Sequence, residues 1–189
     1  MNPDDLDSSF FKAHPVECAR RLIGAEFRWD GCAGRIVETE AYAAEDDPAC
    51  HTFFRPSARS FVEEKPPGAA YVYLNYGVHW LFNVLVKGGE VSGFVLFRAL
   101  EPIEGLSMMQ TRRSRVKEDE LCSGPGRLTQ ALGISGEAHG AEFLSHEARG
   151  IRLGQPMEVL SGPRIGISRG TGLQWRFGAP RCLHLSRRF

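Results

Sequence analysis

Paired cysteine motifs are missing from this sequence, and their absence excludes two kinds of small-domain architecture. The five cysteines are odd in number and form no C-x-x-C pair, which argues against both a disulfide framework and a zinc knuckle. We therefore expect a reducing compartment, the cytoplasm. The first residues, MNPDDLDSS, are acidic and lack the basic and apolar regions of a secretory signal, so nothing in them predicts export.

A membrane-spanning segment is not expected either. Gly68 to Val86 runs for 19 residues without a formal charge, which is about the length of a span. Asn75, Gly77 and His79 interrupt this run, and its flanks YVYL and LFNVLV are rich in aromatic and β-branched residues. The segment therefore predicts two strands of a β-hairpin.

Lysine is rare, whereas arginine is abundant and unevenly placed. The chain has only four lysines, and its net charge is zero. Residues 149–189 nevertheless hold eight arginines against Glu158 alone, a formal charge of +7, so residues 1–148 carry the opposite charge. Planar guanidinium groups suit contacts with phosphate, so this tail is either a phosphate track or a solvated basic surface.

Several familiar catalytic signatures are missing. The sequence contains no H-E-x-x-H, D-x-D-x-D-G or G-x-S-x-G pattern, and the GPGR turn at 124–127 lacks the end of a phosphate-binding loop. No repeat, low-complexity run or linker divides the chain. Because 42% of the residues are hydrophobic and 12 are phenylalanine, we expect one folded domain over residues 1–189.

The expected elements are mixed in type and order. Residues 15–23 open with proline and close on Gly24, as a short helix does, and 125–132 is a second such helix. Residues 33–42 and 91–100 are expected strands, and short strands are expected at IRL (151–153) and RIGISR (164–169). The order predicts an α+β fold on a curved, largely antiparallel β-sheet, with flanking helices and a protruding β-hairpin.

Carboxylates and aromatic rings are concentrated in one part of the chain. Strand alternation places Ile36, Glu38, Glu40 and Tyr42 on one face, and all four tyrosines lie within residues 42–76. Flat rings with polar tips beside carboxylates are typical of a pocket that stacks a planar ligand, although packing of a sheet face is the plainer alternative. A weaker alternative is metal binding, because no metal-binding spacing is present; its candidate ligands are Glu38, Glu40, Asp46, Asp47 and His51.

Five segments together resemble one protein family: RIVETEAY, PPGAAYVYLNYGVHWLFNV, FRALEPIEGLSMM, LCSGPGRLTQALGI and GPRIGISR. These segments occur in the same order as in the alkyladenine family of 3-methyladenine DNA glycosylases, and over roughly residues 15–177 the sequence resembles the bacterial form of that family. The resemblance implies a monomeric, monofunctional base-excision enzyme that flips an alkylated purine out of duplex DNA and hydrolyses its N-glycosidic bond. It implies no cofactor, no metal, no membrane and no obligate protein partner.

The resemblance also implies roles for individual residues. Glu40 matches the general base that activates water, and Arg98 matches the arginine that helps to place that water. Tyr42, His51 and Tyr73 match the walls that sandwich the flipped base, and Asn83 matches the amide that crowds the amino group of guanine. DNA contacts are expected from Tyr76, the intercalating wedge at the hairpin tip, and from Arg59 and Arg164.

Some positions depart from the family pattern, and the function keeps alternatives. After His51 the sequence reads TFFRPSARSFVEEK, in which only Arg59 stays in register, and Gly178 replaces a usual tryptophan. Glu38 corresponds to no role that the resemblance transfers. The lesions expected are 3-methyladenine and 7-methylguanine, with hypoxanthine and ethenoadenine as further candidates. A catalytically silent lesion-binding protein, or a small-glycoside hydrolase using Glu38 and Glu40, is the alternative.

Overall fold

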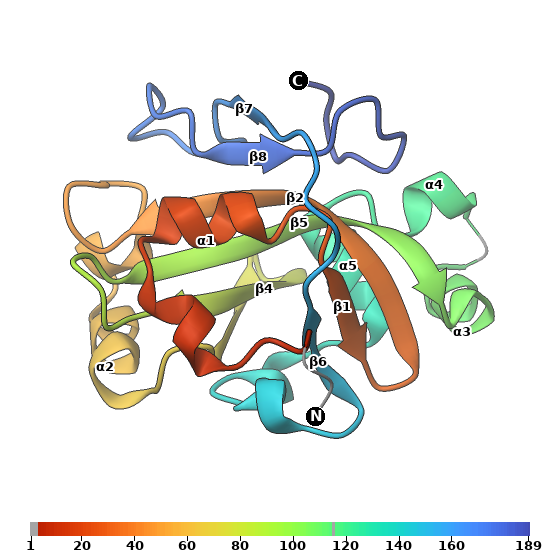
Figure 1. The fold of residues 1–189 in the computed structure, drawn as a ribbon, viewed down its shortest axis with the longest axis horizontal. Helices are drawn as coiled ribbons and strands as arrows, with labels where there is room; N and C mark the ends of the chain where they lie inside the picture. The colour runs from red at the N-terminus through yellow and green to blue at the C-terminus, as the bar shows by residue number, and fades with distance from the viewer. Residues whose placement is uncertain (1–3, 115) are drawn as a thin grey trace.

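One β-sheet organises the fold in the computed structural model, which describes residues 4–114 and 116–189 (Figure 1). The start of the acidic amino-terminal segment, residues 1–3, lies outside the described residues. Within the described residues, eight strands form the sheet, with the order β3-β4-β5-β2-β1-β6 and with β7 and β8 added beside β2. Every strand pair is antiparallel, which confirms the predicted α+β class. The strands are β1 (Glu26–Trp29), β2 (Cys32–Ala43), β3 (Ala70–Asn75), β4 (His79–Val86), β5 (Gly93–Glu104), β6 (Arg149–Arg152), β7 (Leu160–Gly162) and β8 (Arg176–Gly178).

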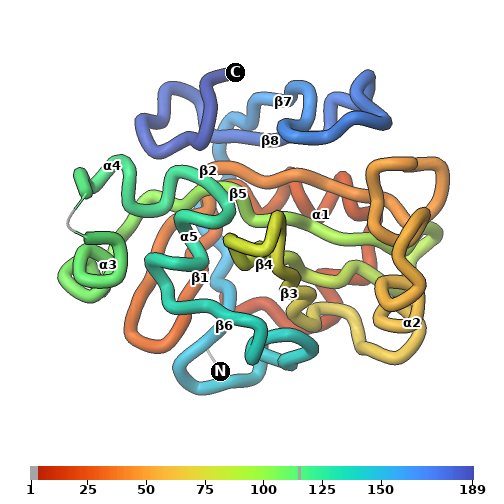
Figure 2. The backbone as a smooth tube through the Cα atoms, turned by 180° about the vertical axis from the view of Figure 1, so that it is seen from behind, coloured from red at the N-terminus to blue at the C-terminus, as the bar shows by residue number. Residues whose placement is uncertain are grey.

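Helices cover both faces of the sheet. The ribbon and the tube, seen from opposite sides, show α1 on one face and α5 on the other (Figures 1 and 2). Proline opens both helices, and the side chain of His14 accepts a hydrogen bond from the Val16 N–H at the start of α1. The helices of the described residues are α1 (Pro15–Arg21), α2 (Pro56–Glu64), α3 (Leu106–Arg112), α4 (Glu118–Leu121) and α5 (Pro125–Leu132), with short 3₁₀ turns η1 (Ser8–Lys12), η2 (His51–Phe53), η3 (Gly136–Ala138) and η4 (Phe143–Ser145).

The predicted β-hairpin is confirmed as β3 and β4. Asn75 pairs with His79 at its end, and Tyr76 and Gly77 both have positive φ angles, 50° and 70°. The described residues contain no helix both long and apolar enough to cross a membrane. The 19-residue uncharged run is thus accounted for by two strands of the sheet, and its tight turn carries Tyr76 away from the core.

The long central strands β2 and β5 carry an irregularity that matters for the site. Their register shifts between Ile36 and Glu38 and again between Glu38 and Thr39, so that Arg98 falls between the paired residues Phe97 and Ala99. Ile36 packs in the apolar core together with Val37, and therefore does not share the surroundings of Glu38 as simple alternation predicted. Such bulges re-aim side chains, and this one directs Arg98 toward the carboxylates.

Candidate active site

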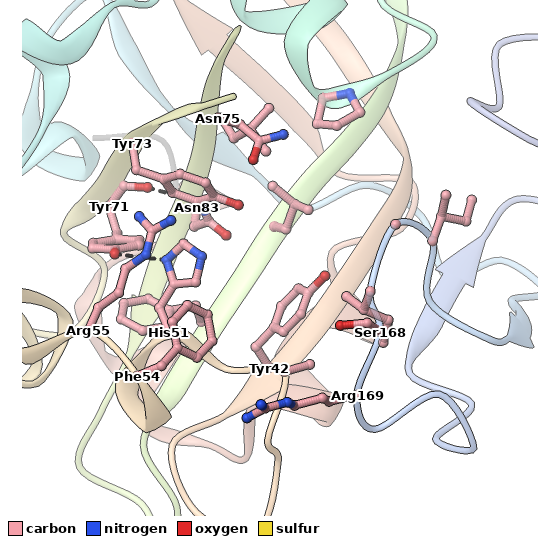
Figure 3. A pocket seen from close by; sticks show the side chains of 18 of the residues that line it. Tyr42, His51, Phe54, Arg55, Tyr71, Tyr73, Asn75, Asn83, Ser168 and Arg169 are labelled. Atoms are coloured by element: carbon pink, nitrogen blue, oxygen red, sulfur yellow. Dashed lines mark hydrogen bonds between the residues drawn. The ribbon is translucent and has the colours of Figure 1, made fainter. Parts of the chain in front are cut away.

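A pocket of about 670 Å³ opens between the β3–β4 hairpin, the loop after β2 and the loop before β8. Tyr42 projects into it from β2, and His51, Tyr71 and Tyr73 lie on the opposite side (Figure 3). The structure thus brings together the aromatic residues that the sequence predicted as pocket walls. A slot between flat rings is suited to holding a planar molecule by stacking.

The wall opposite Tyr42 is held rigid by contacts among its own rings. The His51 and Tyr73 ring centroids are 4.4 Å apart, and His51 Nδ1 lies 3.0 Å from the hydroxyl oxygen of Tyr71. Burial lowers the pKa of His51 to about 4, and the nearby Arg55 guanidinium adds to this effect. His51 is therefore a neutral ring at physiological pH and does not repel a cationic ligand.

Glu40 lies beneath this pocket as a fully buried carboxylate. Its Oε2 accepts a hydrogen bond of 2.7 Å from the Tyr42 hydroxyl, and its Oε1 accepts one of 2.7 Å from the Ile165 N–H. Burial raises the pKa of Glu40 above its usual range, opposed by Arg98 and by both hydrogen-bond donors and assisted by Glu38. A carboxylate with a raised pKa is a stronger base toward a water molecule than an exposed one.

Arg98 is a buried cation shared between two carboxylates. Its Nε donates to Glu38 Oε1 at 3.0 Å, and its Nη1 lies 3.2 Å from Glu40 Oε1. Burial opposes its charge, yet Glu40 and Glu38 hold the pKa of Arg98 above its usual range. Arg98 also lines the pocket, so a permanent positive charge lies between the cavity and the buried Glu40.

Asn83 lies in the same pocket with its amide fixed in orientation. The side chain is only 4% exposed, and its Nδ2 donates to the Tyr71 carbonyl oxygen at 3.1 Å. One amide N–H is thereby committed to the backbone, and the rest of the group faces the cavity. A group held in this way limits the shape of a ligand that enters.

The segment from Pro163 to Trp175 is a loop, so the strand predicted at residues 164–169 is wrong. Arg164 anchors it: its guanidinium is fully buried, bonds both carboxylate oxygens of Asp47 and lies 4.6 Å from the Tyr42 ring centroid. The loop is thus held by a buried bidentate ion pair and not by hydrogen bonds to a neighbouring strand. The next residue, Ile165, is thereby brought to Glu40.

This burial also bears on the DNA contact expected of Arg164. The guanidinium is enclosed by Asp47, the Ala41 carbonyl and Tyr42, and is not exposed for a phosphate. The arginine instead orders the Tyr42 wall and the loop that covers Glu40. The sequence offered Asp47 only as a candidate metal ligand, because no local pattern relates it to Arg164.

Two other residues with expected DNA contacts are on the surface. Tyr76 is 88% exposed at the tip of the hairpin, beside the pocket it helps to line. Arg59 lies on α2, where its Nη1 donates to the Thr52 carbonyl at 2.6 Å. Tyr76 is thus free to reach a partner, whereas Arg59 is tied to the turn that carries His51.

The basic tail is only partly free. Four of its arginines are paired with carboxylates within the protein: Arg149 with Asp30, Arg152 with Asp5, Arg164 with Asp47 and Arg176 with Glu38. The exposed arginines at 169, 181, 187 and 188 make no ion pair within residues 4–114 and 116–189. Of the tail arginines, these four therefore remain available to contact phosphate, and one of them, Arg169, lines the pocket.

Metal binding finds no support in the arrangement of acidic residues. Glu38, Glu40 and Asp47 are each bonded to arginine, and in the part of the chain that the structure describes no cluster of three or more histidine, cysteine or acidic side chains could hold a metal ion. The site as built is an aromatic slot above a carboxylate and a guanidinium.

An aromatic slot above a buried carboxylate, with an exposed tyrosine beside its mouth, is compatible with an enzyme that acts on a nucleobase. Residues 9–182 match the methylpurine-DNA glycosylase (MPG) family, and the chain belongs to that family. It is therefore a DNA repair hydrolase that acts on N-glycosyl bonds.

Individual bacterial proteins are similar over nearly their full length. A protein of Nitrosospira multiformis is 45% identical over 182 residues, covering 95% of this chain and 92% of its own. One of Agrobacterium fabrum is 44% identical over 186 residues, covering 98% and 94%. Both carry names that give 3-methyladenine DNA glycosylase as a provisional assignment.

Proposed function

We propose that this protein excises alkylated purines, such as 3-methyladenine and 7-methylguanine, from duplex DNA. The flipped base would enter the slot between Tyr42 and the His51–Tyr73 wall. Alkylation at N3 or N7 makes the purine cationic, which strengthens stacking on electron-rich rings and weakens the bond to the sugar. The neutral state of His51 supports this proposal, because a charged imidazole would repel such a base.

The observation that carries the mechanism is the setting of Glu40. Its carboxylate is buried beside the pocket, bonded by Tyr42, Ile165 and Arg98. We propose that Glu40 accepts a proton from the attacking water as the base departs, and that its negative charge stabilises the positive charge developing on the sugar. Arg98, which lines the cavity, would help to orient that water.

Specificity and DNA engagement would fall to two further residues. The fixed amide of Asn83 would crowd the 2-amino group of normal guanine and so spare undamaged DNA. Tyr76 would wedge into the duplex and fill the space that the flipped base leaves. Hypoxanthine and ethenoadenine, which are neutral, are further candidate substrates.

The reaction would leave an intact abasic site. Strand cleavage by a glycosylase requires an amine that forms a Schiff base with the sugar. None of the four lysines lines the pocket; Lys87 Nζ, for example, donates to the Glu63 carbonyl at 2.7 Å. We therefore propose a water nucleophile and a monofunctional enzyme.

The direct experiment is incubation with N-methylated duplex DNA followed by chromatography of the released bases. Free 3-methyladenine supports the proposal. Binding of lesion DNA without release would indicate the silent lesion-binding alternative. Activity on small glycosides in place of DNA would indicate the carboxylate-pair hydrolase, which the enclosure of Glu38 by Arg98 and Arg176 disfavours.

Borohydride trapping during turnover tests the nucleophile separately. No covalent protein–DNA adduct is expected. An adduct that disappears in Lys65→Ala would contradict both the water mechanism and the role proposed for Glu40.

A further inference from the structure

Glu38, to which the resemblance assigns no role, is as deeply buried as Glu40 and more fully bonded. Its Oε1 accepts hydrogen bonds from Arg98 Nε at 3.0 Å and Arg176 Nη1 at 3.2 Å. Ser186 completes the set: its hydroxyl donates to Oε1 at 2.9 Å and its N–H to Oε2 at 2.6 Å. A carboxylate with this many donors has one orientation.

Glu38 in turn determines the orientation of Arg98. The guanidinium is planar, so two fixed acceptors define its position, and here they are Glu38 at Nε and Glu40 at Nη1. Its Nη2 also donates to the Ser186 hydroxyl at 3.2 Å. Without Glu38, the one carboxylate among the described residues that still pairs with Arg98 would be Glu40, which is proposed to act on water.

The C-terminal segment, residues 186–189, is packed onto this group of charges. Arg176 donates to the Arg187 carbonyl at 3.0 Å and to the Arg188 carbonyl at 3.2 Å, and its guanidinium lies 3.8 Å from the Phe189 ring centroid. Gly178 has no side chain at the point where Phe189 sits; a Cβ there would lie 2.2 Å from the ring. Residues 186–189 are therefore seated specifically against β8 and Glu38, and Figure 1 shows the end of the ribbon next to β7 and β8.

We propose that Glu38 and Ser186 are positioning residues for base excision, and that the C-terminal segment holds Arg98, through Glu38, in the place from which it contacts Glu40. This inference rests on the proposed function, because the reaction to be supported is the one proposed for Glu40 and Arg98. It assigns to the last residues of the chain a role in the chemistry in addition to any contact with DNA.

A positioning role differs from a purely structural one in its pH dependence. The charged or titratable groups facing Glu40 are Arg98 on β5, Glu38 and Tyr42 on β2, Tyr73 on β3 and Arg164 in the loop before β8. Ser186→Ala keeps the charge of Glu38 but loosens Arg98, the cation that lowers the pKa of Glu40, so this pKa rises. Because the ionised form of Glu40 is the active one, the acid limb of the rate profile moves to higher pH. In Glu38→Gln the same release of Arg98 is opposed by the loss of a like charge, so the rate and not the pH profile is the readout for that variant. Loss of folded protein alone would scale the rate equally at every pH.

The experiment compares wild type, Glu38→Gln, Ser186→Ala and the control Ser161→Ala, an exposed serine on β7. Single-turnover base release on methylated duplex is measured across pH, together with the Kd for abasic duplex and the urea midpoint. We expect release to fall about tenfold in Glu38→Gln and Ser186→Ala, with Kd unchanged, as loss of a hydrogen bond to a charged group predicts. Ser186→Ala should also move the acid limb to higher pH, and Ser161→Ala should match wild type.

Each other outcome has a distinct meaning. Wild-type rates and pH profiles in both variants would overturn the inference while leaving the proposed function intact. Rates that fall only in proportion to the folded fraction, without a shift in the acid limb, would also overturn it. Ser186→Ala changes a half-buried hydroxyl only, so it tests the inference even if Glu38→Gln fails to fold. No base release by wild type would refute the proposed function itself.

Discussion

Glu40 combines full burial with three hydrogen-bonding or ionic partners, so its substitution can be made nearly isosteric. Glu40→Gln keeps the shape of the side chain but cannot accept a proton from water. We expect base release to fall by about 10²- to 10⁴-fold while the affinity for abasic duplex is retained. Single-turnover release and a binding titration measure the two quantities. Full activity in Glu40→Gln would show that another group is the base.

His51 illustrates how burial sets the charge of a single residue. Its pKa is lowered to about 4 by burial and by Arg55, so we expect a neutral imidazole from about pH 5 to pH 8. The unfolded chain takes up a proton at this residue near its ordinary pKa, so His51 makes the fold less stable as the pH falls from there toward about 4. A histidine titration by NMR measures the value. A pKa at or above the ordinary one would contradict a desolvated wall.

At the scale of elements, the β3–β4 hairpin presents one exposed ring on a tight turn. We expect Tyr76→Ala to weaken engagement of a lesion in duplex DNA more than in single-stranded DNA, because only the duplex has a gap to fill. Unstacking costs a few kcal/mol, which the ring partly offsets. Val78→Ala, at a 69% exposed position in the same turn, is the control. Equal losses on the two substrates would rule out a wedge.

The loop from Pro163 to Trp175 depends on one buried ion pair. Asp47→Asn leaves the guanidinium of Arg164 without its charge partner, and we expect the free energy of unfolding to fall by about 3 kcal/mol. Asp30→Asn, which breaks the more exposed pair with Arg149, should cost less than about 1 kcal/mol. Urea denaturation of both variants measures the difference. Equal costs would mean that the Arg164 pair is no stronger than a surface contact.

At the scale of the whole molecule, the charge on the tail is divided between internal pairs and a free surface. Affinity for undamaged duplex should fall with salt, and Arg169→Gln should reduce the slope of log K against log salt by about one unit. Arg149→Gln should leave the slope unchanged, because Asp30 already neutralises that guanidinium. Fluorescence anisotropy over a salt series compares the two. An equal effect of Arg169→Gln and Arg149→Gln on the salt slope would mean that arginines paired within the protein also contact phosphate.

Much of the fold was predictable because its signals are local. The hairpin could be read from aromatic and β-branched runs around a turn, and both halves of that pattern lie within 19 residues. The helices at residues 15 and 125 were marked by proline at their starts. The pocket residues could be named in advance because the motifs that carry them resemble a known family. Strand alternation failed only at Ile36, where a bulge interrupts the ladder.

By itself, the sequence determined the β3–β4 hairpin, the two helices that open with proline, the long central strands, the aromatic composition of the pocket and the class of enzyme. The tertiary structure alone decided how the charges pair. Arg164 meets Asp47 across 117 positions, and Ser186 meets Glu38 across 148. Contacts at such separations leave no periodic pattern, since they depend on how β2 is placed against the loop before β8 and the chain end. For the same reason, the sequence of the basic tail could not distinguish the four arginines that form ion pairs within the protein from the four that do not. An arginine is neutralised only where folding brings a carboxylate next to it.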